Sequence, residues 1–172
     1  MTKLPKISEE LRAQILEAFP DTGQRFESLA ELLSAKAALG PIQKLWAKKL
    51  LNIPPRHAKA GWIHNIDPVY LSYPAYCAFV PVMLLSGRLG FGLGPGATSL
   101  CIDLPAFARR GEDWSAWEDR WREGLVEYCN QAQIKALTAY VKSYLEAYPT
   151  PETCPGDHRN CIEFWERASQ NS

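Results

Sequence analysis

Hydrophobic positions dominate one stretch of the chain, residues 68–87 (PVYLSYPAYCAFVPVMLLSG), which contains no Asp, Glu, Lys, Arg or His. Apolar side chains would cover every face of a helix there, a pattern typical of an element buried on all sides. An interior proline loses a backbone hydrogen bond and clashes with the preceding turn, so Pro74 favours a helix start over a kink. We therefore expect a short turn, then a central helix over residues 73–86.

Three amphipathic helices are predicted before this stretch. Ser8 can cap the first, and Pro20 ends it. The second runs from Asp21 or Thr22 to Gly40 and has the most regular spacing, with these apolar positions: Phe26, Leu29, Ala30, Leu33 and Ala37. Pro41 begins the third, whose single apolar face consists of Ile42, Leu45, Trp46 and Leu50, with Lys44, Lys48 and Lys49 mostly outside it. Residues 53–67 are expected to form a loop with at most one turn.

The pattern changes after residue 87. Leu and Phe alternate with Gly, and Gly94-Pro95-Gly96 is a turn signal, so a small β-hairpin is predicted over residues 88–104. A helical stripe returns from Asp113 to Tyr128, in which Trp114, Trp117 and Trp121 are expected to face the core. A long helix is expected from about residue 131 to 148, a loop over 150–160 and a short helix over 161–168.

Together these elements predict a mainly α fold, a single-domain helical bundle of six or seven helices with one small β-hairpin. A chain of 172 residues suits one domain. We find no internal repeat and no linker that would mark a second domain.

Composition and charge exclude several classes of protein. The chain has 19 basic and 19 acidic residues, so no net field attracts nucleic acid or an anionic membrane. Prolines and serines interrupt the uncharged stretch, which disfavours a transmembrane helix. The first residues resemble no secretory signal, and five cysteines suit reduced thiols better than a disulfide framework. These features predict a cytoplasmic protein.

Two segments invite a chemical interpretation. The glycine-rich run over residues 87–96 lacks the Gly-Lys-Ser/Thr of a phosphate-binding loop, so the hairpin explains it more simply. Cys154, His158 and Cys161 in CPGDHRNC could ligate a metal or form a thiol site. A structural metal site needs a fourth ligand from elsewhere, and the alternative is a polar surface loop. No cofactor motif is present, and the sequence does not favour an enzyme.

One charge feature stands out. No acid occurs between Glu31 and Asp67, whereas residues 36–64 contain six Lys or Arg interleaved with Trp and His, and residues 103–127 contain seven acids. Clustered cations with aromatic residues can contact a protein partner or a nucleic-acid backbone. Solvated helix faces remain the alternative. The candidate partner-binding residues are Lys44, Lys48, Arg56, His57, Lys59 and Trp62.

Three segments together resemble a family of small bacterial proteins known only as a domain of unknown function: LWAKKLLNIPP, IDPVYLSYPAYCAFVPVMLL and NQAQIKALTAYVKSYLEAY. In that family a Trp-containing helix precedes an aromatic core helix of Y-x-P-A-Y type, matched here by Tyr73, Pro74, Ala75 and Tyr76. The resemblance covers about residues 42–148 and implies no activity. Small stand-alone proteins of this sort are sometimes immunity proteins, which bind and block a cognate toxin. Because we find no catalytic or cofactor motif and the charged faces are separate, we expect a protein-binding protein of immunity or antitoxin type. One alternative is a metal-binding protein or enzyme that uses Cys154, His158 and Cys161, and another is nucleic-acid binding through residues 36–64.

Overall fold

The computed structural model describes residues 6–66, 68–85, 100, 113–147 and 155–170, with the side chains of all of these except 113–120 and 155–160. The chain divides into two compact units, each described here by itself. Unit 1 consists of Met1–Lys6 and Phe19–Ala97, and unit 2 of Ile7–Ala18 and Thr98–Ser172. The single domain expected from chain length stays a prediction.

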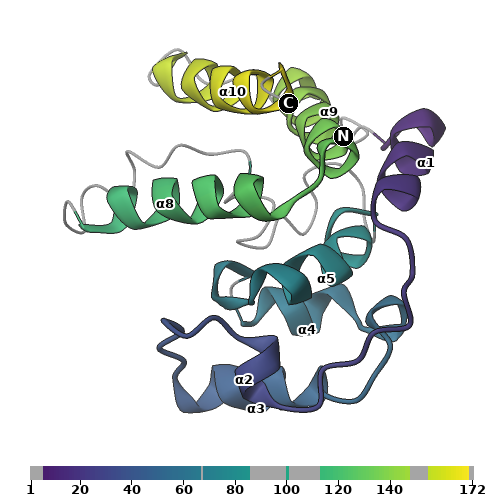
Figure 1. Ribbon diagram of the computed structural model, residues 1–172, viewed down its shortest axis with the longest axis vertical. Coiled ribbons are helices and arrows are strands. Elements are labelled where there is room, and N and C mark those ends of the chain that lie inside the picture. Colours follow the sequence, from purple (N-terminus) through teal and green to yellow (C-terminus); the bar gives the residue numbers. More distant parts are fainter. Residues whose placement is uncertain (1–5, 67, 86–99, 101–112, 148–154, 171–172) are drawn as a thin grey trace, which may run out of the picture. The chain divides into compact units, whose positions relative to one another are not determined.

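The described residues form eight α-helices and two short 3-10 helices (Figure 1). Unit 1 contains α2 Leu29–Leu32, α3 Pro41–Lys49, η1 Pro55–His57, α4 Ala60–His64, η2 Pro68–Tyr70 and α5 Tyr73–Leu85. Unit 2 contains α1 Glu9–Ala18, α8 Asp113–Tyr128, α9 Gln131–Ala147 and α10 Pro155–Gln170. The mainly α class is confirmed. More helices occur than the predicted six or seven, because α4 lies where a loop was expected.

The predicted β-hairpin, residues 88–104, lies outside the described residues except for Leu100, and it stays a prediction. In the part of the chain that the structure describes, no strand forms. An isolated antiparallel bridge joins Leu33 to Leu71.

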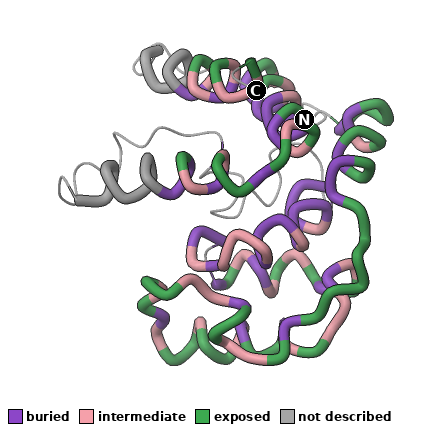
Figure 2. The backbone as a smooth tube through the Cα atoms, in the orientation of Figure 1, coloured by how far each residue is buried: buried purple, intermediate pink, exposed green. Residues whose placement is uncertain are grey.

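The uncharged helix α5 forms as predicted and is the most buried helix of unit 1, whereas its place at the centre of one helical bundle stays a prediction. It follows the single turn η2, begins at Tyr73 and packs against η1, α4 and α2. Tyr76, Phe79 and Val80 are fully buried, and the ring of Phe79 lies 5.9 Å from that of Phe26. Buried residues accordingly follow α5 over most of its length in Figure 2.

The long amphipathic helix predicted from Asp21 or Thr22 to Gly40 is wrong. The observed helix α2 has four residues, capped by Ser28, whose hydroxyl accepts from the Glu31 amide. Before it, Asp21 accepts from the amide of Gly23, which has a φ of 67°. Such a local side-chain bond and left-handed backbone compete with a helix. After α2 the chain is extended, and the amide of Ser34 donates to the Tyr70 carbonyl at 2.8 Å.

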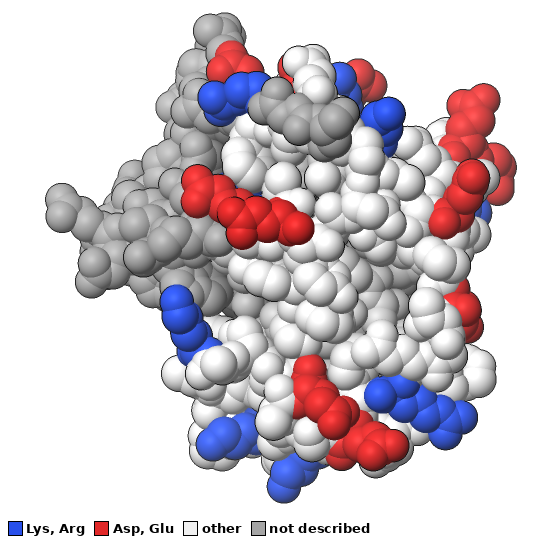
Figure 3. Space-filling view, in the orientation of Figure 1, with Lys and Arg blue, Asp and Glu red and all other residues white. Residues whose placement is uncertain are grey.

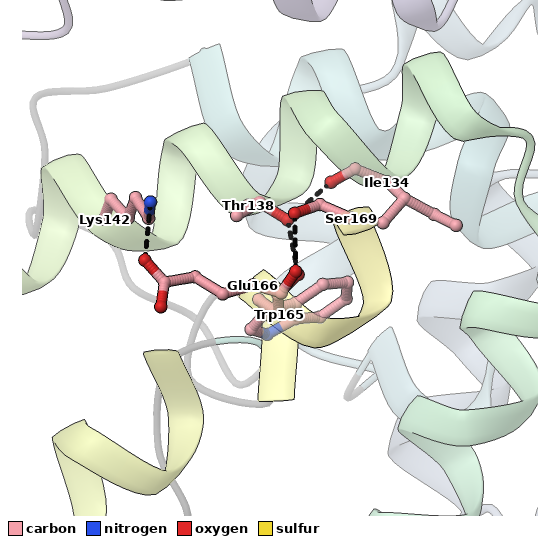
Figure 4. Close-up of polar contacts among 6 residues, drawn as sticks. All are labelled: Ile134, Thr138, Lys142, Trp165, Glu166 and Ser169. Carbon is pink, nitrogen blue, oxygen red and sulfur yellow. Dashed lines mark hydrogen bonds and ion pairs between the residues drawn. The ribbon is translucent and has the colours of Figure 1, made fainter. Parts of the chain in front are cut away.

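Helix α9 is the centre of unit 2 and packs against α10 and α1. Thr138 on α9 donates from its hydroxyl to the Ile134 carbonyl at 2.8 Å and lies 3.1 Å from the Trp165 carbonyl on α10 (Figure 4). Nearby, Lys142 and Glu166 form an ion pair at 2.7 Å. The long helix predicted from about residue 131 is therefore confirmed, and two kinds of polar contact join it to α10.

Helix α10 begins earlier than expected. Residues 155–160 were predicted as loop, but they form its first turns, with Pro155 at the first helical position. Proline suits that position because the missing N–H would have no intrahelical partner there. The fully buried Trp165 donates from Nε1 to the Leu100 carbonyl at 2.9 Å. Trp121 of α8 is also buried, as predicted.

Candidate partner-binding surface

Helix α3 presents an unexpected face to solvent. It begins with Pro41, and the Gln43 side chain accepts from the Gly40 amide, which fixes its start. Its inward residues are Ala47 and Leu50, both fully buried. Ile42 and Leu45 therefore point outward, 71% and 62% exposed. The prediction that the apolar residues of this helix share one inward face is wrong for these two, which we call the apolar stripe.

Lysines and tryptophans meet between α3 and α4. The Lys49 ammonium lies 4.1 Å from the centre of the Trp46 ring and 5.9 Å from that of Trp62. The Lys59 ammonium lies 5.6 Å from the Trp62 ring. Each such exposed contact stabilises the fold by only about 0.5–1 kcal/mol. The two half-buried indoles nevertheless hold two cations on one surface.

The predicted partner-binding residues all lie in unit 1, and all except Arg56 and Trp62 are exposed. Lys44 and Lys48 are exposed on α3, His57 is exposed at the end of η1, and Lys59 is exposed just before α4. We call Lys44, Lys48, Lys49 and Lys59, with Trp46 and Trp62, the lysine surface. In the described chain none of these four lysines has an ion-pair partner.

Arg56 differs from the other candidates. Its guanidinium is half-buried and donates to the Phe19 carbonyl, so it joins η1 to the segment that begins at Phe19. A guanidinium engaged in this way is less available to a partner. Arg56 therefore has a structural role that its charge alone did not indicate.

His64, on α4, adds no positive charge at neutral pH. Partial burial removes water from the imidazole and lowers its pKa below the ordinary histidine value. The lysines therefore account for the charge on this surface.

Acidic side chains border the lysine surface. Helix α2 contacts α3 and carries Glu31, whose carboxylate accepts from the amide of Glu27. In Figure 3, basic and acidic side chains both appear over the region of α2 and α3. The acid-free run along the sequence thus gives a basic surface of limited extent.

Sequence reasoning expected Ile42, Leu45 and Trp46 on an inward face, and it did not single out the contacts of Lys49 with the two tryptophans. The spacing of Ile42, Leu45 and Trp46 showed a helical face, but it did not show that the small residue Ala47 would mark the inward side. A competing signal was available, because Ala47 and Leu50 are also one turn apart.

The candidate metal or thiol residues are described only in part. Cys154 lies outside the described residues, and His158 and Cys161 lie one turn apart on α10. The Cys161 thiol is buried and donates to the Leu100 carbonyl at 3.0 Å. Among the residues with described placement, no group of three His, Cys, Asp or Glu could hold a metal ion. A metal or thiol site here stays a prediction.

The acidic segment, residues 103–127, is described only at its end. Glu123 and Glu127 are exposed on α8 and line an open groove of about 400 Å³ between α8 and α10. The other lining residues are Val126, Phe164, Arg167 and Ala168. Arg167 offsets part of the negative charge, so this groove is only weakly acidic.

The glycine-rich run lies outside the described residues. None of the described helices is both long enough and apolar enough to cross a bilayer.

The chain was compared with protein-family models, curated proteins and solved structures, and none of them matches it.

Proposed function

We propose that this chain is a cytoplasmic protein-binding protein of the immunity or antitoxin type, which neutralises a partner by covering its active site. The lysine surface supports the proposal most directly: Lys49 and Lys59 lie against the half-buried Trp46 and Trp62, and Lys44 and Lys48 are exposed on the same helix as Trp46. Aromatic residues are enriched where protein partners bind, and complementary charge increases the rate of encounter.

The partner would carry a net acidic interface. Lys44, Lys48 and Lys59 would act mainly by long-range attraction, and Trp46 and Trp62 by contact. His57 would lie at the rim. The immunity or antitoxin type comes from what small stand-alone proteins of this sort sometimes do, and the surface itself supports only protein binding.

The test begins with a tagged pull-down from the native cell at moderate salt, followed by identification of any protein bound in stoichiometric amount. The association rate of that protein is then measured for the triple variant Lys44→Glu, Lys48→Glu, Lys59→Glu. We expect the rate to fall at least about tenfold at low salt, because steering by these charges is reversed.

The matched control is Lys135→Glu, an exposed lysine on α9 in unit 2 with no partner among the described residues. It should leave the association rate nearly unchanged. If the triple variant and the control bind equally fast, with normal helix content, the lysine surface is not where the partner binds.

A further inference from the structure

The apolar stripe of α3 indicates that a partner would contact this helix with apolar side chains, which the charges of the lysine surface do not indicate. Four large hydrophobic side chains are exposed in the described part of the chain: Leu16, Ile42, Leu45 and Tyr128. Ile42 and Leu45 are the two most exposed, and they lie one turn apart on a single helix. Adjacent exposed apolar side chains with a polar rim are typical of interaction sites.

Lysines lie on one side of the stripe and at its C-terminal end. Successive residues of a helix are about 100° apart around its axis, given 3.6 residues per turn. Leu45 therefore lies between Lys48 and Lys49, opposite the buried Ala47 and Leu50. Ile42 follows on the side of Lys49 and leads to Trp46. The outer face of α3 thus has two exposed apolar side chains with Lys48 on one side, Trp46 on the other and Lys49 at the C-terminal end.

We propose that this face binds an acidic helix of a protein partner, one whose own apolar side chains are bordered by Asp or Glu. This inference rests on the proposed function and specifies the partner's chemistry. The partner's apolar side chains would cover Ile42 and Leu45, and its carboxylates would meet Lys44, Lys48 and Lys49. Recognition by an apolar helix face with charges at its edges is a common mode of peptide binding.

Two other occupants fit the observations less well. A nucleic-acid backbone would satisfy the lysines but would leave Ile42 and Leu45 against phosphates. An anionic membrane would receive only two aliphatic side chains, with about eight carbon atoms, whereas even a myristoyl chain of about fourteen binds only marginally.

The experiment measures fluorescence anisotropy of labelled peptides titrated with the full chain. One peptide is a Leu–Glu helix with a stripe of Leu bordered by Glu, and the second replaces each Leu by Ser at the same charge. We expect the Leu–Glu peptide to bind at least about tenfold more tightly than the Ser–Glu peptide. The double variant Ile42→Ser, Leu45→Ser should remove most of this preference.

The matched control is Leu16→Ser, which removes an exposed leucine from α1 in unit 2. It should preserve the preference, and circular dichroism should show the same helix content for every variant. Equal affinity for the two peptides would overturn the inference. So would an equal loss of the preference for the Leu–Glu peptide in the control and in the double variant. Tighter binding to phosphatidylglycerol vesicles or to duplex DNA than to the Leu–Glu peptide would also overturn it.

The natural partner separates this inference from the proposed function. If charge reversal of the lysines weakens that partner's binding but Ile42→Ser, Leu45→Ser does not, the proposed function stands and the apolar stripe has no part in it. Weakening by both sets of variants supports both proposals.

Discussion

His64 links protonation to the stability of unit 1. Its pKa in the folded protein is lowered by burial, whereas in the unfolded chain it takes the ordinary value of about 6.5. Below that value the unfolded state binds more protons than the folded state, so stability falls as the pH decreases. The loss begins near the unfolded pKa and continues until the folded protein also takes up the proton.

We expect His64→Gln to reduce the loss of stability between about pH 7.5 and pH 5.5. The substitution should change this pH-dependent loss in the free energy of unfolding by less than about 1 kcal/mol, because the half-buried imidazole still reaches water. Urea denaturation at the two pH values measures it. Asn65→Gln is the control, since it changes an exposed neighbouring side chain without removing a titratable group, and it should keep the pH dependence of the unchanged protein. Identical pH dependence in all three proteins would contradict the role given to His64.

Among the elements of unit 1, α5 has the most buried residues, so replacing its side chains by smaller ones should destabilise the fold. Phe79 is fully buried against Phe26. We expect Phe79→Ala to lower the free energy of unfolding by about 3–5 kcal/mol, because it removes apolar contacts and leaves a cavity.

The matched variant is Phe79→Leu, which keeps most of the volume and should cost less than about 1.5 kcal/mol. The free energy of unfolding of each variant is measured by urea denaturation, monitored through a spectroscopic signal from unit 1. Equal losses for the two variants would show that packing at this position does not depend on side-chain volume.

The sequence predicted α5 well because its signal did not depend on orientation. A helix that is apolar on every side can be recognised without knowing which side faces the core. Helices α3 and α2 show the opposite case. The amphipathic pattern of α3 predicted a helix correctly, but the inward side was set by the buried Ala47 and Leu50.

In the segment containing α2, helical spacing coincided with extended structure. Phe26 is buried before α2 begins, and Leu33 forms a bridge with Leu71 after it ends. Of the five apolar residues at helical spacing only Phe26 is buried, so the spacing did not mark the inward face of a helix, and turns determine the path of this segment. Gly23, with its positive φ, was a visible signal for such a turn.

The candidate site was predicted from charge and missed where it depended on packing. Lys44, Lys48 and Lys59 were found because the absence of acids is a property of the sequence. The contacts of Lys49 with Trp46 and Trp62 join two helices, and the exposure of Ile42 and Leu45 depends on how α3 packs in unit 1. These are tertiary facts that local spacing does not contain.

At the scale of the whole molecule, unit 2 is built from two separate parts of the chain. Helix α1 packs against α9, although about a hundred residues lie between them along the chain. Ile15 on α1 is fully buried. We expect Ile15→Ala to cost about 2–4 kcal/mol and to destabilise unit 2 in preference to unit 1.

Native-state hydrogen exchange can measure this effect separately in each unit, because amides open in cooperative groups. Amides of α9 and α10 should exchange faster in Ile15→Ala, and amides of α5 should change little. The control is Leu16→Ala, at the exposed neighbouring position. Faster exchange confined to α5 would contradict the assignment of α1 to unit 2.

The position of α1 also matters during synthesis on the ribosome. Translation at about 5–20 residues per second would leave α1 waiting roughly 5–20 s before α9 has been made. During that time Leu11 and Ile15 have no native partner from α9, whereas the sequence of unit 1 is completed earlier. A nascent chain of this protein would therefore expose the apolar side of α1, to which a ribosome-associated chaperone could bind.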